Sequence, residues 1–133
     1  MSSVEELVRR TLAMYAHRHD SRDVEGYASL FAVDGCFVSA RSEYRGRAAV
    51  KDFIADLYRS QPADRRTKHL CGNTTVDLDG SIASAITDFV AYERFGDGAW
   101  QVHTIGQYRD RLVLEDGEWR FAERRVVTGP TAH

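Results

Sequence analysis

The chain has 133 residues and a formal net charge of −2, with 43% hydrophobic and 29% charged residues. This length is enough for one domain with a buried core, and the composition is ordinary for a soluble globular protein. The near-neutral charge gives no electrostatic basis for binding nucleic acid or an anionic membrane. The sequence therefore predicts a single domain over residues 1–133, with neither nucleic acid nor a membrane as partner.

Two further absences bear on the compartment. No apolar run approaches the roughly 18 residues of a membrane span, and no signal peptide precedes the first predicted helix. Cys36 and Cys71 are too few and too isolated for a disulfide framework or a metal cluster. We interpret both as buried free thiols in a reducing compartment. The expectation is a cytoplasmic protein without a metal site.

The first half of the chain has mainly helical periodicity. Apolar side chains between Val4 and Tyr15 recur at helical spacing, and Ser2 and Ser3 each precede a glutamate by three positions, as in a capping box. These features predict a helix from about Val4 to His19. Asp23 is a suitable N-cap for a short second helix that would carry Tyr27, Leu30 and Phe31.

The next segment mixes short extended pieces with a third helix. The turn Asp34-Gly35 leads into an apolar strand at residues 36–38, and residues 43–45 form a short extended piece. After Gly46 an apolar stripe from Val50 to Tyr58 predicts a third helix, which ends before Pro62.

After Pro62 the pattern changes from helical to alternating. The predicted strands cover residues 67–78, 81–95, 99–114 and 118–127. Asp79-Gly80, Gly96-Asp97-Gly98 and Asp116-Gly117 separate them, and Asp-Gly between alternating apolar runs is a strong hairpin signal. Helices followed by an antiparallel meander indicate an α+β domain whose helices pack on one face of the sheet. Strands of this length must bend around the helices, which leaves a cup for a small ligand.

Three segments resemble the SnoaL-like, or nuclear transport factor two-like, superfamily: YAHRHDSRDVEGYASLFAVDG, RTKHLCGNTTVDLDG and GQYRDRLVLEDGEWRFAERRV. The resemblance extends from about Val4 to Val127. It implies a cone-shaped α+β fold, in which three N-terminal helices pack against a strongly curved, mainly antiparallel sheet that encloses a pocket. The first two segments look most similar to the branch of scytalone dehydratase and the bile-acid dehydratases.

That branch pairs an aspartate just after the first helix with a histidine on the first long strand, and the matching positions are Asp20 and His69. The step from Tyr15 to Asp20 is similar to a tyrosine–aspartate step in the bile-acid enzymes, whose tyrosine contacts substrate oxygen. Two positions depart from the pattern. His19 stands where scytalone dehydratase has a second tyrosine, and Tyr92 stands where the branch has histidine or aspartate.

The chemistry of these side chains is consistent with the resemblance. A carboxylate that accepts a hydrogen bond from one ring nitrogen of His69 leaves the other nitrogen free as a base, and it stabilises the imidazolium after proton transfer. The alternative is a buried histidine bonded to Asp20 for stability alone. Tyr15 lies on the apolar stripe, so its hydroxyl needs a partner. That partner is either substrate oxygen or, in a purely structural role, the backbone.

Strand alternation adds candidates for substrate binding. His69 and Asn73 share a face of the first long strand, so Asn73 faces the cup if His69 does. Asp88 and Tyr92 share a face of the second long strand. An unpaired carboxylate is costly to bury, so Asp88 meets solvent, pairs with an arginine or belongs to the pocket.

The third long strand carries Gly106-Gln107-Tyr108-Arg109-Asp110, which is similar to the GxYxD pattern of the superfamily. We expect Tyr108 to line the pocket as a substrate-binding residue. We interpret Asp110 as a structural residue that pairs with Arg124 or Arg125.

The resemblance implies a cofactor-independent lyase, a dehydratase acting on a small hydroxylated carbonyl compound that is polyketide-like or steroid-like. Asp20, His69 and Tyr15 would be catalytic, and the expected partner is a small-molecule substrate. One alternative is an isomerase or polyketide cyclase that uses the same dyad. Another is a non-catalytic module for small-molecule binding or dimerisation. Members of this superfamily commonly pair through exposed sheet surface, so the resemblance also implies a homodimer or homotrimer.

Overall fold

The structure is a computed structural model that describes residues 1–129. This part of the chain forms helices α1 (Val4–Asp20), α2 (Val24–Ala28) and α3 (Arg47–Ser60), and strands β1 (Phe31–Val38), β2 (Glu43–Arg45), β3 (Arg65–Asp79), β4 (Ile82–Phe95), β5 (Gln101–Glu115) and β6 (Glu118–Thr128). The α+β class and the order of the elements expected from the sequence are confirmed. No helix in the described range is both long and apolar enough to cross a membrane.

The helix starts follow from local hydrogen bonding. Of the two serines that fit a capping box, Ser3 caps α1, because its Oγ accepts a hydrogen bond from the Glu6 N–H at 3.1 Å. The Asp23 side chain caps α2 by accepting from the Gly26 N–H at 2.9 Å. Both caps satisfy backbone donors that have no partner within the helix.

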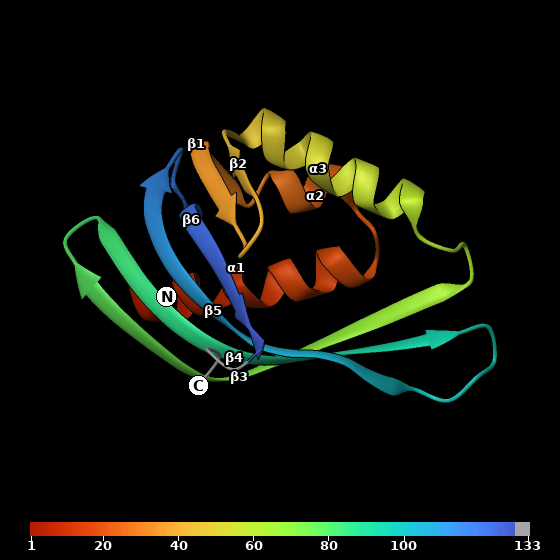
Figure 1. The fold of residues 1–133 in the computed structure, drawn as a ribbon. Coiled ribbons are helices and arrows are strands. Elements are labelled where there is room, and N and C mark those ends of the chain that lie inside the picture. Colours follow the sequence, from red (N-terminus) through yellow and green to blue (C-terminus); the bar gives the residue numbers. More distant parts are fainter. Residues whose placement is uncertain (130–133) are drawn as a thin grey trace.

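All six strands belong to one sheet in the order β2-β1-β6-β5-β4-β3. Strands β3 to β6 form the expected antiparallel meander, whereas β1 pairs in parallel with β6. The sheet is strongly curved and does not close on itself, and α1 lies on its concave side (Figure 1). Helix α3 contacts α2 and the strands β1 and β2.

The prediction that the second helix carries Leu30 and Phe31 is wrong. Helix α2 ends at Ala28, and Phe31 is the first residue of β1, where it pairs with Phe121 of β6. The Leu30 carbonyl accepts a hydrogen bond from the Phe121 N–H at 2.8 Å. Sheet pairing therefore outweighs helix propensity at these two residues, a tertiary effect that local periodicity does not encode.

A buried ion pair crosses the concave face of the sheet. Arg124 Nε and Nη2 donate to the two carboxylate oxygens of Asp110 at 2.8 and 3.0 Å, and both side chains are almost completely buried. The guanidinium carbon lies 3.7 Å from the ring centroid of Tyr108 and 4.1 Å from that of Tyr15. Of the two arginines expected to pair with Asp110, Arg124 does so, because Arg125 points to the other face of β6.

Both cysteines are free, as expected. Cys36 is buried, but Cys71 is exposed, so the prediction of two buried thiols is wrong for Cys71. Cys71 lies on β3, the edge strand of the sheet, which has a neighbouring strand on one side only.

Candidate functional site

A cavity of about 250 Å³ lies between helices α1 and α3 and the concave face of the sheet. We call it the His69 cavity. Its lining includes Tyr15 and His19 from α1, Tyr58 from α3, His69 from β3, Phe89 from β4 and Tyr108 from β5. The strands and helices that meet here are far apart in the sequence, so the cavity is a product of the tertiary fold.

Asp20, the last residue of α1, is bonded to His69 in two ways. Its Oδ1 lies 2.6 Å from His69 Nδ1 and 3.0 Å from Thr67 Oγ1, and its Oδ2 accepts from the His69 backbone N–H at 2.8 Å. Burial raises the pKa of Asp20, but the hydrogen bonds from His69 and Thr67 outweigh it and hold this pKa below its ordinary value. An ionised Asp20 requires the proton on His69 Nδ1.

This arrangement leaves Nε2 of His69 available for chemistry. The side chain of His69 is 9% exposed and lines the cavity, and Nε2 has no hydrogen-bond partner among residues 1–129. A neutral imidazole whose Nδ1–H is bound by a carboxylate has an unshared electron pair on Nε2. The sequence-predicted pair is thus brought together with the geometry of a general base and the group that orients it.

His19 stacks on His69, with ring centroids 4.5 Å apart and an interplanar angle of 29°. Its Nδ1 lies 2.8 Å from the hydroxyl oxygen of Tyr58. Burial lowers the pKa of His19 to about 3, and a proton on His69 acts in the same direction by charge repulsion. His19 is therefore neutral at physiological pH. In the sequence His19 is a departure from the tyrosine of scytalone dehydratase and was not among the predicted site residues. Its position four residues after Tyr15, on the same helix face, is the signal that could have identified it.

The Tyr15 hydroxyl is bonded to another hydroxyl and not to the backbone. It lies 2.8 Å from the hydroxyl of Tyr27, and both rings are buried. Burial raises the pKa of both phenols, so both remain protonated. Tyr15 lines the His69 cavity and Tyr27 does not. When Tyr27 donates to the Tyr15 oxygen, the Tyr15 O–H is free to donate to a bound ligand.

Tyr108 lines the same cavity, and its hydroxyl makes no hydrogen bond within the described residues. Its ring stacks on that of Phe89 at a centroid distance of 4.2 Å and an angle of 15°. This stack depends on Gly106, because a Cβ there would lie 2.7 Å from the Phe89 ring. The glycine of the GxYxD pattern thus lets an aromatic wall approach the strand.

Asn73 does not face the cavity, and the expectation that it shares a face with His69 is wrong. Between the pairs Gly72–Asp88 and Thr75–Ile86, two residues of β3 oppose one residue of β4, and Asn73 has a φ of 52°. This β-bulge reverses the alternation, so that Asn73 is exposed and donates to Asp88 at 3.1 Å.

Asp88 and Tyr92 also lie outside the cavity, on the face of β4 opposite Phe89 and Ala91. Of the three alternatives for Asp88, the structure shows the one in which it meets solvent. Asp88 is exposed, and hydrogen bonds from Asn73 and Gln107 hold its pKa below the ordinary value. Alternation correctly groups Asp88 with Tyr92, but both faces of this strand carry apolar residues. The pattern alone therefore does not determine which face is concave.

A second bulge brings His103 of β5 into the lining of the cavity, next to Thr104. Between the pairs Ala91–Thr104 and Tyr92–Val102 of β4 and β5, His103 has no partner. His103 and Thr104 consequently both line the cavity. His103 Nδ1 lies 3.4 Å from a Glu93 carboxylate oxygen, whose other oxygen accepts from Arg65 Nε at 2.8 Å.

Comparisons with known proteins agree with this fold. The SnoaL-like domain family matches residues 2–125 of the chain. A variant of Rv3472, a protein of unknown function from Mycobacterium tuberculosis, is 28% identical with a TM-score of 0.84, over 94% of this chain and 76% of that one. A nuclear transport factor two-like protein with a cystatin-like fold from Novosphingobium aromaticivorans is 26% identical with a TM-score of 0.85, over 96% and 83% of the two chains.

ActVI-ORFA from Streptomyces coelicolor has a TM-score of 0.85 over 96% of this chain and 98% of its own; its 21% identity makes this a likeness of fold alone. No curated protein matches the sequence. The SnoaL-like family includes polyketide cyclases and dehydratases. Because the family match extends over nearly the whole chain, this protein belongs to the SnoaL-like family.

Proposed function

We propose that this protein is a cofactor-independent dehydratase, a lyase that removes water from a small hydroxylated carbonyl compound. The contact between Asp20 and His69 at the wall of a partly apolar cavity is the observation that carries this proposal. It supplies an imidazole whose Nε2 makes no hydrogen bond within residues 1–129, and an adjacent carboxylate that stabilises the imidazolium. Tyr15 and Tyr108 add two protonated hydroxyls in the same cavity.

The proposed reaction proceeds through an enolate. His69 Nε2 takes the proton α to the carbonyl. The C–H electrons form the C=C bond of the enolate, and the C=O π electrons move onto the oxygen, which accepts hydrogen bonds from Tyr15 and Tyr108. The enolate then re-forms the carbonyl and expels the β-hydroxyl group, which takes the proton from the His69 imidazolium and leaves as water. The product is an α,β-unsaturated carbonyl compound, and His69 returns to its neutral form.

His19 supports this proposal because it is uncharged next to His69. Its pKa of about 3 keeps it neutral, so a single positive charge forms in the stacked pair when His69 accepts a proton. A protonated His19 would oppose that step by repulsion at a centroid distance of 4.5 Å. The same pKa leaves His19 unprotonated near neutral pH, so it has no imidazolium proton to donate, and His69 is the group that returns the proton.

The size of the cavity bears on the substrate class. Its volume of about 250 Å³ is below the roughly 300–1,000 Å³ typical of pockets for drug-sized ligands. Its aromatic walls, Phe37 and Phe89, suit a flat ring. Of the two substrate classes that the resemblance implies, a small polyketide-like ring fits this volume better than a steroid.

Product mass tests the reaction. A panel of cyclic β-hydroxy ketones is incubated with the protein, and we expect at least one product lighter than its substrate by one water. An isomerase or cyclase would use the same base and hydroxyl donors, and a product of unchanged mass would favour it and contradict dehydration. Saturable binding without turnover, unchanged in His69→Gln, would instead indicate a non-catalytic binding module.

We also propose a homodimer or homotrimer that forms through the convex face of the sheet. Leu70, Val90 and Ile105 are cross-strand neighbours there, and Leu70 and Ile105 are 51% and 62% exposed. An apolar row of this kind is typical of an interaction surface. We expect Ile105→Glu to shift the protein to a monomer in analytical ultracentrifugation. Leu114→Glu, at the other end of the same strand, is the control, and an unchanged mass for Ile105→Glu would contradict this interface.

A further inference from the structure

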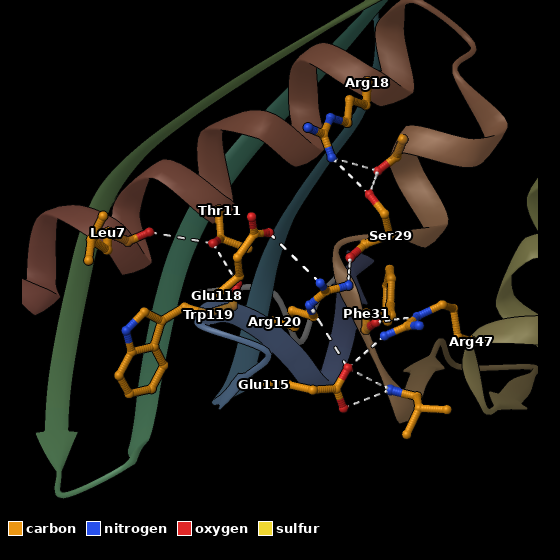
Figure 2. A network of polar contacts seen from close by, with 12 residues as sticks. Leu7, Thr11, Arg18, Ser29, Phe31, Arg47, Glu115, Glu118, Trp119 and Arg120 are labelled. Carbon is orange, nitrogen blue, oxygen red and sulfur yellow. Dashed lines mark hydrogen bonds and ion pairs between the residues drawn. The ribbon is translucent and has the colours of Figure 1, made fainter.

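A second cavity lies beside a different face of α1, where this helix meets the β5–β6 turn and residues 29–30 between α2 and β1. Figure 2 shows the polar contacts around it. We call it the Trp119 cavity. Its volume is about 330 Å³, larger than that of the His69 cavity and within the range of small-molecule pockets. None of the residues proposed for catalysis lines it. Whatever occupies it would therefore bind apart from the proposed reaction.

The charged lining of the Trp119 cavity is mainly basic. Three arginines, Arg10, Arg18 and Arg120, and a single carboxylate, Glu118, line it. Within residues 1–129 no carboxylate lies in ion-pair distance of Arg10 or Arg18. Arg18 Nη1 donates to the Gly26 carbonyl at 2.8 Å and to Ser29 Oγ at 3.0 Å, which positions the guanidinium without neutralising it.

Arg120 has a donor that the described residues leave unsatisfied. Its Nη1 donates to the Ser29 carbonyl at 2.8 Å, and the side chain is only 16% exposed. Its Nε is buried and has no hydrogen-bond partner in this range. Carboxylate oxygens of Glu115 and Glu118 lie 3.9 Å from the guanidinium, which is too far for a hydrogen bond.

Glu115 is already occupied by other donors, as Figure 2 shows. It accepts from Arg47 Nη2 at 2.6 Å and from the Val33 N–H at 3.1 Å. It therefore does not neutralise Arg120 fully. The nearest carboxylate to the buried Nε is Glu115, which does not line the cavity, so the donor available to a ligand is Nη2. Nη2 makes no hydrogen bond within residues 1–129 and lies 3.9 Å from Glu118, which does line the cavity. An arginine held in place with such a donor is a suitable ligand for a carboxylate or phosphate oxygen, since both groups form charge-assisted bonds to arginine.

The rest of the lining is apolar, formed by Leu7, Met14, Leu30 and Trp119. We propose that the Trp119 cavity binds an amphipathic oxyanion, a carboxylate or phosphate ester with a short apolar chain. The anionic group is held by Arg18 and Arg120, and the chain packs on Met14 and Trp119. The inference does not depend on the reaction proposed for the His69 cavity.

Tryptophan fluorescence provides the test, because the chain has two tryptophans and Trp100 is outside the cavity. In a Trp100→Phe background, octanoate and octyl phosphate are titrated below their micellar concentrations, with octanol and octylammonium as controls. We expect at least one anion to bind saturably, at least tenfold more tightly than either control. The tighter of the two anions identifies the carboxylate or the phosphate as the recognised group.

Variants then locate the binding. Arg18→Gln and Arg10→Glu are expected to weaken it at least tenfold, and Arg120→Gln likewise where the loss of its bond to Ser29 is tolerated. Arg9→Gln is the matched control, because Arg9 is exposed on the same helix but pairs with Glu5 outside the cavity. Arg10 is exposed, so Arg10→Glu should fold normally. It therefore tests the location of the anion even if Arg120→Gln does not fold.

Three results would overturn the proposal. The first is the absence of saturable binding by either anion, and the second is octanol binding as tight as octanoate. The third is amide NMR shifts that centre on His69 and Tyr108 when the anion is added, with none at Ser29 or Gly117. The third result would place the ligand in the other cavity.

Discussion

Replacing His69 with alanine is expected to lower turnover of a hydroxy-ketone substrate by roughly 10²–10⁴-fold, the usual contribution of a general acid–base group. In the proposed reaction His69 both removes the α-proton and returns a proton to the departing hydroxyl, so its loss affects both steps. The ring is a lining residue of the cavity and not part of the buried core, so the variant should still fold. Formation of the unsaturated carbonyl product, followed by its ultraviolet absorbance, measures the effect.

Asp20→Asn should have an effect of similar size through a different cause. The amide retains the shape of the carboxylate but carries no charge, so it neither favours the Nδ1–H form of His69 nor stabilises the imidazolium. His17→Gln is the matched control, because His17 is exposed on the same helix. Full activity in either the His69 or the Asp20 variant, with native circular dichroism and thermal midpoint, would remove the dyad from the mechanism.

The second large effect is a loss of stability in mild acid caused by His19. In the unfolded chain His19 takes up a proton as the pH falls through about 6.5, whereas in the folded protein its pKa is about 3. Between these values the unfolded state binds more protons, so the free energy of unfolding decreases as the pH decreases. A difference of about 3.5 pH units corresponds to roughly 5 kcal/mol when the window is crossed completely.

Urea unfolding measured at intervals from pH 7 to pH 4 checks this prediction. His19→Gln removes the titrating ring, so the variant should lose less free energy of unfolding over this range than the wild type. Its stability at pH 7 is not the readout, because the substitution also removes the stack on His69 and the bond to Tyr58. The exposed His17→Gln serves as control. Parallel pH profiles for the wild type and His19→Gln would show that His19 is not kept neutral by burial.

Much of the architecture was predictable because its determinants are local. Ser3 and Asp23 cap helices through side chains that lie three positions before the amides they bind. The Asp79-Gly80 and Asp116-Gly117 turns occur where predicted, and Gly80 and Gly117 have the positive φ values that such turns need. The same signals do not show that β1 pairs in parallel with β6, which moved Phe31 from the predicted helix into the sheet.

The site was predictable only in part. Asp20 and His69 were identified by resemblance, and the structure brings them into contact. One physical cause explains why Asn73 was wrongly predicted to face the cavity and why His103 was not predicted to line it. A single extra residue in a strand changes which face of the sheet the following side chains point to. His19 and Tyr58 lay on predicted helix faces, but their contact with each other depends on how α1 and α3 pack.

The sequence by itself determined the α+β class, the element boundaries to within a few residues in most cases, and the aspartate–histidine pair. The elements were predictable because periodicity, caps and turns depend on a few neighbouring residues. The aspartate–histidine pair was predicted from the resemblance to the SnoaL-like superfamily. Only the tertiary structure decided which face of each strand is concave, that Tyr15 is bonded to Tyr27, and that Arg18 and Arg120 line one cavity. Those features depend on side chains brought together by curvature and bulges, whose positions are set by the packing of the whole sheet.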